Sequence, residues 1–199
     1  AYQLLENYEN STYIQLNKLL NKTAKEVCEG QQMDIDFESK LNVSFEQYIK
    51  MVSCKTAVLL GCSLKMGAIV AGASIEDQEN IYQFGINLGL AFQLQDDYLD
   101  TFGNENLVGK KIGGDIIENK KTVLYHMAMI NSSKNQKTYI TELYNSNDIS
   151  NKIKISKLTL LFKETKADIS SKKLINQYTK KAIDSINRLS IDQNFKNED

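Results

Sequence analysis

The chain has 199 residues, no proline and a formal net charge of −1, and 42% of its residues are hydrophobic. That hydrophobic fraction excludes an intrinsically disordered chain, and the near-neutral charge argues against a general binder of nucleic acids or anionic membranes. Prolines gather in turns, loops and edge strands, so their complete absence favours long helices with short connections. We therefore expect a single all-α domain over residues 1–199, with no nucleic-acid partner.

The cellular location is predicted from signals that the sequence lacks. No uninterrupted apolar run reaches the roughly 18 residues of a membrane span, and the first residues do not have the basic-then-apolar order of a secretory signal. Cys28, Cys54 and Cys62 have neither the spacing of a disulfide framework nor that of a zinc site. We expect a cytoplasmic protein without a membrane span, in which Cys54 and Cys62 pack as small core residues.

The first part of the chain has the apolar periodicity of two helices. Apolar residues at three- and four-residue intervals predict a helix through about residue 27, which Gly30 is expected to end. Ser44 and Gln47 have the spacing of a capping box and predict a second helix over about 45–70. Its second half is apolar nearly all round, which predicts a buried central helix. The small residues at 67–73 would let another helix approach closely.

The rest of the chain is also expected to be helical. Ser74, followed three residues later by an aspartate, begins a long helix over about 75–100. A loop with four glycines follows, and the next helix begins near Asp115 or Lys121. Three amphipathic helices are predicted after it, over about 135–145, 151–165 and 168–190, before a polar tail at 191–199 that is expected to fray.

The most informative segment is the end of the long helix, where three carboxylates occur within five residues. Asp96 and Asp100 are four residues apart and share a face, while Asp97 is three residues from Asp100. Like charges placed so closely repel, but a bound divalent cation reverses the sign of the interaction, and oxygen ligands alone suit magnesium. The alternative is a solvated helix end whose acids only terminate the helix. An incomplete carboxylate set favours a metal–diphosphate complex, because Mg²⁺ keeps water or phosphate oxygens as its other ligands.

Basic and polar residues around this segment fit an anion site. Lys110 lies in the glycine-rich loop and Lys120 lies after it, and both are within about 30 residues of the acids in the sequence. Lys55 interrupts the most apolar helix, where a charge is costly unless it snorkels to solvent or has a partner. Gln93, one turn before Asp97, would place an amide dipole at the same cavity.

Other polar residues are expected to have structural roles. His126 follows the lysines on an amphipathic helix and is predicted to pack partly buried, and Tyr98 is predicted to pack its ring between the acids. The lysines at 152–166 alternate with apolar residues and predict a solvated helix face beside a buried one.

Taken in order, these motifs resemble the trans-type polyprenyl diphosphate synthases, which include the farnesyl and geranylgeranyl diphosphate synthases. The detailed match covers about residues 28–125. It is carried by Gly30-Gln31 with Asp34, Lys55-Thr56, Phe92-Gln93, Asp96-Asp97-x-x-Asp100, Gly109-Lys110, Gly113, Asp115 and Lys120-Lys121-Thr122. The resemblance implies the isoprenoid-synthase helical bundle, with an apolar cavity and three Mg²⁺ at its mouth. It also implies chain elongation, in which an allylic diphosphate joins isopentenyl diphosphate and diphosphate is released.

The resemblance also assigns catalytic and metal-binding roles. Asp96 corresponds to the main magnesium ligand of the family's second aspartate-rich motif, and Asp97 and Asp100 correspond to supporting or water-mediated ligands. Thr56 and Gln93 would present oxygen dipoles to the developing carbocation, an interaction that strengthens in the transition state.

The same resemblance assigns the substrate contacts. Phe92 would lie against isopentenyl diphosphate, and Gln31 and Asp34 would support the site from the facing helix. The allylic diphosphate would be held by the family's lysines, which correspond here to Lys55, Lys110 and Lys120.

The chain departs from the family by lacking the first aspartate-rich motif and its paired arginines. Arg188 is the only arginine, and the chain begins with Ala1 rather than methionine. We therefore expect the C-terminal portion of a homodimeric prenyl synthase, without the N-terminal helices and with little or no turnover by itself. Two alternatives stay open: a terpene cyclase of the same fold, and a shortened, non-catalytic partner subunit of a prenyl synthase.

Overall fold

The computed structural model describes residues 2–40, 42–104, 109, 111–146 and 148–190, and within these ranges the chain is all-α, as predicted. The tail at 191–199 lies outside the described residues, so its expected fraying stays a prediction. The helices are α1 (Tyr2–Leu5), α2 (Asn10–Ser39), α3 (Phe45–Val52), the π-helical turn η1 (Ser53–Ala57), α4 (Val58–Val70), α5 (Ile75–Phe102), α7 (Gly114–Ile117), α8 (Val123–Asn131), α9 (Lys134–Asn145), α10 (Asn151–Glu164) and α11 (Ala167–Asn187).

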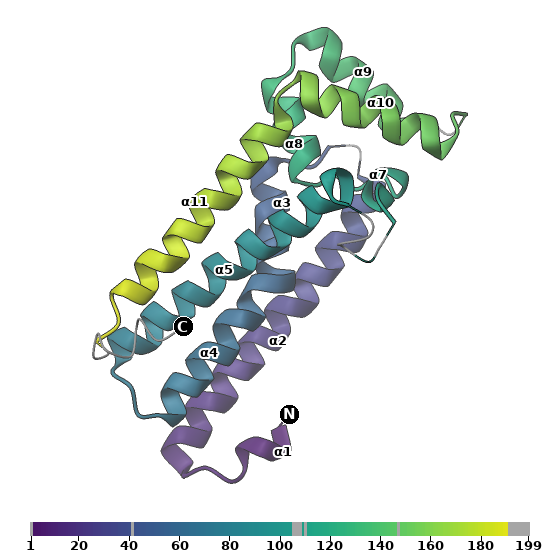
Figure 1. The fold of residues 1–199 in the computed structure, drawn as a ribbon. Coiled ribbons are helices and arrows are strands. Elements are labelled where there is room, and N and C mark those ends of the chain that lie inside the picture. Colours follow the sequence, from purple (N-terminus) through teal and green to yellow (C-terminus); the bar gives the residue numbers. More distant parts are fainter. Residues whose placement is uncertain (1, 41, 105–108, 110, 147, 191–199) are drawn as a thin grey trace.

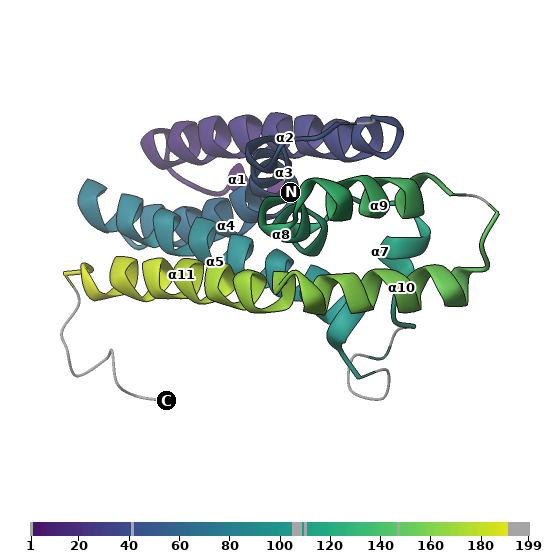
Figure 2. The same cartoon turned by 90° about the horizontal axis from the view of Figure 1, so that it is seen from above.

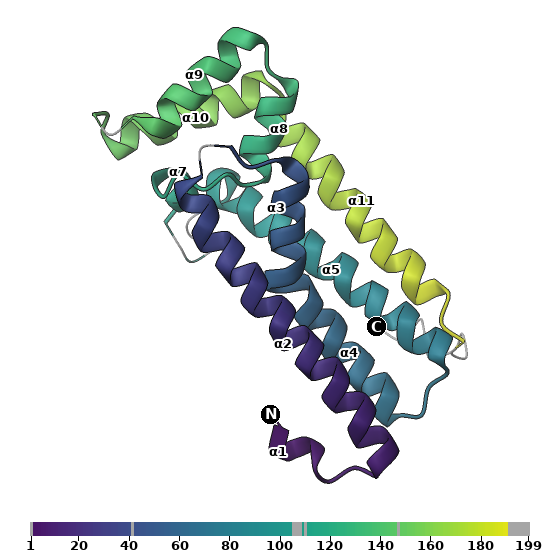
Figure 3. The same cartoon turned by 180° about the vertical axis from the view of Figure 1, so that it is seen from behind.

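Four long helices form the body of the molecule. Figure 1 shows α2, α4, α5 and α11 side by side in that order, and Figure 3 shows the same order from behind. Seen from above in Figure 2, α2 and α11 lie on opposite sides of the α4–α5 pair. Helices α7 to α10 gather at one end, and α1 lies at the other. This arrangement places the C-terminal ends of α2 and α5 next to the short helix α7.

The predicted helix starts are confirmed by their caps. The backbone N–H of Gln47 donates to Ser44 Oγ at 3.2 Å, and the N–H of Ser44 donates to Gln47 Oε1 at 2.8 Å. Ser74 Oγ likewise accepts from the backbone N–H of Asp77 at 3.0 Å. Each cap satisfies amide groups that a helix terminus otherwise leaves without an acceptor.

The prediction that Gly30 ends the first helix is wrong. α2 continues through Gly30 to Ser39, and Gly30 is buried in its interior. A Cβ on Gly30 would lie 2.4 Å from the backbone nitrogen of Lys55 and 2.8 Å from Cys54 Cβ. The glycine is therefore needed because the backbones of α2 and η1 meet at this point, and the free energy gained by that contact outweighs its poor helix propensity.

The predicted helix over 45–70 is continuous, but it contains a π-helical turn that periodicity does not reveal. In η1 the amide of Val58 donates to the carbonyl of Ser53, five residues earlier. Single π turns inside α-helices occur often at functional sites, because the extra residue re-aims the side chains around it. Here the turn contains Lys55 and Thr56.

The small residues that bring helices together are not those expected. A Cβ on Gly67 or Gly72 would meet nothing within 4 Å, whereas a Cβ on Gly85 would lie 2.6 Å from the Cα of Gly61. The close contact between α4 and α5 is thus made near the N-terminal end of α4. Of the small residues at 67–73, Gly67 and Gly72 make no such approach within the described part of the chain.

Several predicted packing roles are confirmed, and one is wrong. Cys54 and Cys62 are buried, as are Tyr98 and His126. Lys154, which was predicted to lie on a solvated face, is also buried, with 4% of its surface exposed. It is buried because two oxygens accept hydrogen bonds from its Nζ: the side-chain oxygen of Asn119, after α7, and the carbonyl of Tyr144 on α9.

The helix formed by α3, η1 and α4 is the most apolar long helix in the described part of the chain. The segment Phe45–Val70 has a window of mean hydropathy 1.3 and is, in the described part of the chain, the one helix long and apolar enough to cross a membrane. Buried core helices pass the same test, and this one packs against α2 and α5. The expected absence of a membrane span stays a prediction.

The contact at Gly30 yields a stability prediction. Gly30→Ala should lower the free energy of unfolding by about 3 kcal/mol, because the added Cβ overlaps backbone rather than a flexible side chain. Gly67→Ala is the matched control, since its Cβ enters open space within a helix and should raise stability by about 0.5–1 kcal/mol. Urea unfolding of both variants measures the difference, and equal effects would contradict the close-contact explanation.

Candidate active site

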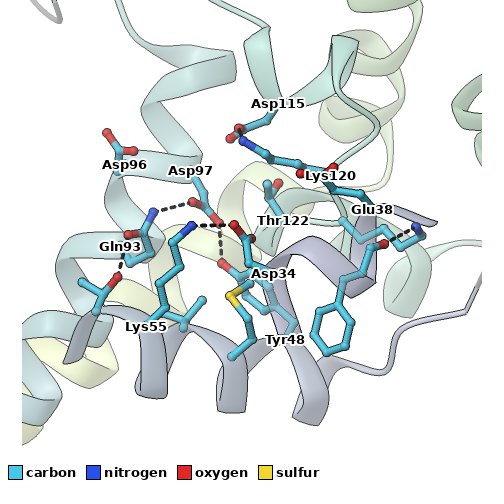
Figure 4. A pocket seen from close by; sticks show the side chains of 15 residues that line it. Asp34, Glu38, Tyr48, Lys55, Gln93, Asp96, Asp97, Asp115, Lys120 and Thr122 are labelled. Atoms are coloured by element: carbon cyan, nitrogen blue, oxygen red, sulfur yellow. Dashed lines mark hydrogen bonds and ion pairs between the residues drawn. The ribbon is translucent and has the colours of Figure 1, made fainter. Parts of the chain in front are cut away.

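A pocket of about 300 Å³ opens at the end of the bundle where α2, α3, η1 and α5 face α7. Figure 4 shows its side chains, which come from segments far apart in the sequence. The titratable and hydrogen-bonding residues that line it are Asp34, Glu38, Tyr48, Lys55, Thr56, Gln93, Asp96, Asp97, Asp115, Lys120, Lys121 and Thr122. Most of the residues singled out from the sequence are therefore brought to one place.

A chain of hydrogen bonds crosses the inner wall of the pocket. Thr56 Oγ1 donates to Gln93 Oε1 at 3.1 Å, and Gln93 Nε2 donates to Asp97 Oδ1 at 3.0 Å. The hydroxyl of Tyr48 donates to the other carboxylate oxygen, Asp97 Oδ2. Because each member fixes the next, the orientation of the Gln93 amide is set by its two neighbours.

The ionisation of this buried pair is shifted by its surroundings. Burial raises the pKa of Asp97, while the hydrogen bonds from Tyr48 and Gln93 act in the opposite direction. Burial and the Asp97 charge raise the pKa of Tyr48 well above its ordinary value. Tyr48 therefore keeps its proton across the physiological range and remains a hydrogen-bond donor to Asp97.

A second polar contact joins α2 to the π turn. Lys55 Nζ lies 2.5 Å from Asp34 Oδ2, and the two side chains are 37% and 19% exposed. The partner that a lysine in this apolar helix requires is thus Asp34, on the facing helix α2. The ammonium group stays accessible from the pocket.

The opposite wall is formed by α7 and the residues after it. Lys120 Nζ lies 2.6 Å from Glu118 Oε2 and 3.6 Å from Asp115 Oδ1. Burial alone would lower the pKa of Lys120, but its bond to Glu118 and the charges of Asp115, Glu118 and Asp34 raise it above the ordinary lysine value. Lys121 donates to the carbonyl of Phe37 at 3.4 Å, and burial lowers its pKa.

The three aspartates of α5 do not share one environment. Asp96 lies at the edge of the pocket in Figure 4, while Asp97 is held in the wall by Tyr48 and Gln93. Asp100 is 5% exposed, and its Oδ2 accepts the backbone N–H of Asp115 at 3.0 Å, at the start of α7. The described residues contain no group of three or more His, Cys, Asp or Glu side chains placed to hold one metal ion.

These carboxylates fit a magnesium ion only in part. Asp96, Asp97 and Asp115 supply oxygen ligands of the kind that Mg²⁺ prefers, and they line the same pocket. Because they form no closed cluster, an ion here would take most of its ligands from water and from a bound anion.

Some predicted site residues lie elsewhere. Phe92 is 64% exposed and Gln31 is also exposed, and neither lines the pocket. Lys110 falls outside the described residues. Asp100 does not line the pocket, and its carboxylate accepts the backbone N–H of Asp115 at the start of α7.

Tyr48 is the main residue that the sequence reading missed. It lines the pocket with Met51, Val52 and Lys55, and these four residues follow the i, i+3, i+4, i+7 spacing of one helix face. The sequence signal for Tyr48 is therefore its position on the same helix face as Lys55, which indicates that both side chains reach the same pocket. Asp115, which belongs to the family motifs but was given no site role, and Glu38, which belongs to none of these motifs, also line the pocket.

Comparisons with known proteins identify the family. The polyprenyl synthetase family model matches residues 1–160. The chain belongs to the polyprenyl synthetase family. The predicted family resemblance and the isoprenoid-synthase type of helical fold are thereby confirmed.

Curated relatives of this polyprenyl synthetase chain are prenyl diphosphate synthases. It is 31% identical over 188 residues to a geranylgeranyl diphosphate synthase of Sulfolobus acidocaldarius, covering 94% of this chain and 56% of the relative. It is 43% identical over 105 residues to a geranylfarnesyl diphosphate synthase of Natronomonas pharaonis, covering 53% of this chain and 31% of the relative. The chain thus spans about half, or less, of the length of these relatives.

Solved structures agree with this family assignment. A geranylgeranyl pyrophosphate synthase superposes with a TM-score of 0.91 at 43% identity, covering 97% of this chain and 60% of the other. The geranylgeranyl pyrophosphate synthetase of Pyrococcus horikoshii Ot3 gives a TM-score of 0.85 at 27% identity, covering 96% of this chain and 58% of the other.

The buried Tyr48–Asp97 contact predicts a stability loss on removal of one hydroxyl. Tyr48→Phe leaves Asp97 Oδ2 buried without its donor and should lower the free energy of unfolding by about 2 kcal/mol. Tyr139→Phe, at a tyrosine that is 40% exposed on α9, should change it by less than about 0.5 kcal/mol. Denaturant unfolding at neutral pH compares the two, and a similarly small change in both would contradict the assigned role.

His126 predicts a pH-dependent stability. Burial among Phe45, Tyr48 and Tyr125 lowers its pKa to about 4, so the folded protein keeps the imidazole neutral while the unfolded chain takes up a proton near pH 6.5. The contribution of His126 to the free energy of unfolding is therefore fully present above the pKa of the unfolded chain. It is lost progressively as the pH drops from about 7 to about 4. The loss between pH 7.5 and 5 attributable to His126 should be about 2 kcal/mol.

The variant His126→Phe isolates this contribution, because a phenyl ring can occupy the same aromatic cluster without taking up a proton. The pH dependence of urea unfolding should be weaker in His126→Phe than in the parent chain by that amount. Identical pH profiles would show that His126 does not titrate as its burial implies.

Proposed function

We propose that this chain forms part of the active site of a chain-elongating trans-prenyltransferase, which joins an allylic diphosphate to isopentenyl diphosphate. The observation that carries the proposal is the convergence of acids and lysines on one pocket beside a hydrogen-bonded polar wall. A pocket with cations on two sides suits a diphosphate group, and the adjoining amide and hydroxyl oxygens suit a carbocation.

In this reaction the allylic carbon–oxygen bond breaks and the diphosphate leaves with the bonding electrons. The double bond of isopentenyl diphosphate then attacks the allylic carbon, and the released diphosphate takes the proton whose loss forms the new double bond. Lys55 and Lys120, from opposite walls, would hold the leaving diphosphate. Their present partners, Asp34 and the Asp115–Glu118 pair, orient both ammonium groups before substrate enters.

The polar wall would act on the carbocation. The Thr56 hydroxyl proton is directed to Gln93, which leaves oxygen lone pairs of Thr56 available to the pocket. The amide of Gln93 is itself held by Asp97, so neither dipole needs to reorganise when positive charge develops. This fixed orientation favours the transition state over bulk water, whose dipoles would have to turn.

Magnesium, when bound, would neutralise diphosphate charge and so make the leaving group better. Asp96, at the edge of the pocket, is the residue proposed as its principal ligand from this chain. Asp97 is proposed as a supporting or water-mediated ligand. Because the described carboxylates form no closed cluster, we expect the 199-residue chain by itself to bind magnesium and diphosphate with little turnover.

The proposal is tested with the complete gene product by measuring incorporation of labelled isopentenyl diphosphate into prenyl diphosphates. Lys55→Met and Asp96→Asn should each lower the rate by about 100-fold, as expected for losing a group that acts on the developing charge. Lys50→Met and Asp184→Asn are the controls, because both residues are exposed on helices of the same bundle and outside the pocket.

Two outcomes would overturn the proposal. Release of a hydrocarbon from an allylic diphosphate without isopentenyl diphosphate would assign a terpene cyclase. Unchanged elongation in both pocket variants would show that this pocket is not where the chemistry occurs.

A further inference from the structure

A buried lysine lies outside the pocket just described. Lys154 on α10 is 4% exposed, and its Nζ donates to Asn119 Oδ1 at 2.5 Å and to the carbonyl of Tyr144 at 3.0 Å. Both accepting oxygens are uncharged, and burial lowers the lysine pKa. An apolar side chain of similar length would avoid the cost of burying an ammonium group, so stability alone does not account for the lysine.

The residue that Lys154 binds forms the turn leading into the pocket. Asn119 has a φ of 57°, in the left-handed region that asparagine adopts more readily than most residues. The next two residues, Lys120 and Lys121, both line the pocket. The hydrogen bond from Lys154 therefore holds the side chain of the residue whose backbone conformation directs these two lysines.

The neighbouring residue on α10 contacts the other end of α7. Gly113, which precedes α7, has a φ of 85°, and a Cβ there would lie 2.7 Å from Ile155 Cδ1. Consecutive residues of α10 thus contact both flanks of α7. The start of α7 is also bound to α5, where the Asp100 carboxylate accepts the backbone N–H of Asp115.

We propose that Lys154 is a positioning residue that acts through Asn119 to hold Lys120 and Lys121 at the pocket, ready for a diphosphate group. It does not itself line that pocket. The role of the held lysines rests on the proposed function, whereas the mechanical link from α10 to the turn does not.

The mechanical link is tested without ligand by hydrogen–deuterium exchange of the 199-residue chain. Lys154→Met should speed exchange of the amides at 113–122 by about tenfold, the effect of losing one hydrogen bond from a charged donor. Exchange in the middle of α5 should stay unchanged. Lys157→Met, at an exposed lysine of the same helix, is the control and should change neither region. Unchanged exchange at 113–122 in Lys154→Met would overturn the proposal.

The link to the site is tested by titrating inorganic diphosphate into the chain in the presence of Mg²⁺ and measuring its affinity. The temperature is kept well below the melting temperature of each variant. Lys154→Met should weaken binding by about fivefold, and Asn119→Gly should do the same, because glycine accepts the positive φ but lacks the Oδ1 acceptor. The double variant should bind no more weakly than either single variant, since both changes remove one shared interaction.

The outcomes separate the two proposals. Additive losses, or a lower melting temperature with unchanged diphosphate affinity, would reduce Lys154 to an ordinary structural residue. Failure of the parent chain to bind diphosphate would contradict the expectation that the 199-residue chain binds diphosphate by itself, and the exchange experiment would still decide whether α10 positions the turn.

Discussion

A carboxylate inside a helical bundle must be partnered, and the partners of Asp97 organise the pocket. Asp97 is 7% exposed, and its two oxygens accept from Tyr48 on α3 and Gln93 on α5. Gln93 in turn accepts from Thr56 in the π turn. The cost of burying this charge is offset only while all three elements keep their places, so packing of the bundle and preorganisation of the site depend on the same contacts.

The second constraint is the contact between the backbones of α2 and η1. Gly30 has no Cβ, which lets α2 approach the backbone nitrogen of Lys55, and the π turn re-aims the residues around that point. Lys55 then reaches Asp34, one helical turn beyond Gly30 on α2. A glycine that lowers local helix propensity therefore positions a charged pair at the pocket, and the long helix is stabilised by tertiary contact rather than by its sequence alone.

Features that depend on a few adjacent residues could be predicted correctly from the sequence. The Ser44–Gln47 cap and the intrahelical Lys55 could be recognised because capping spacing and the cost of a buried charge are properties of a few adjacent residues. Gly30 was misread because only the presence of η1, about 25 residues later in the chain, explains it. Lys154 was misread for the same reason, since its acceptors lie on other segments.

The aspartate-rich segment shows how tertiary contacts divide a motif that is uniform in sequence. Helical spacing puts Asp96 and Asp100 on one face, and the family resemblance assigns Asp96 as the main magnesium ligand with Asp100 in support. Docking of α7 separates them, because its first amides need an acceptor and Asp100 supplies it. Asp100 thereby binds the start of α7, while Lys154 binds Asn119 after its end and Asp96 lies at the edge of the pocket. Asp97 also lines the pocket but is tied to Tyr48 and Gln93, and Asp100 is tied to the start of α7, so three acids of one motif have three different environments.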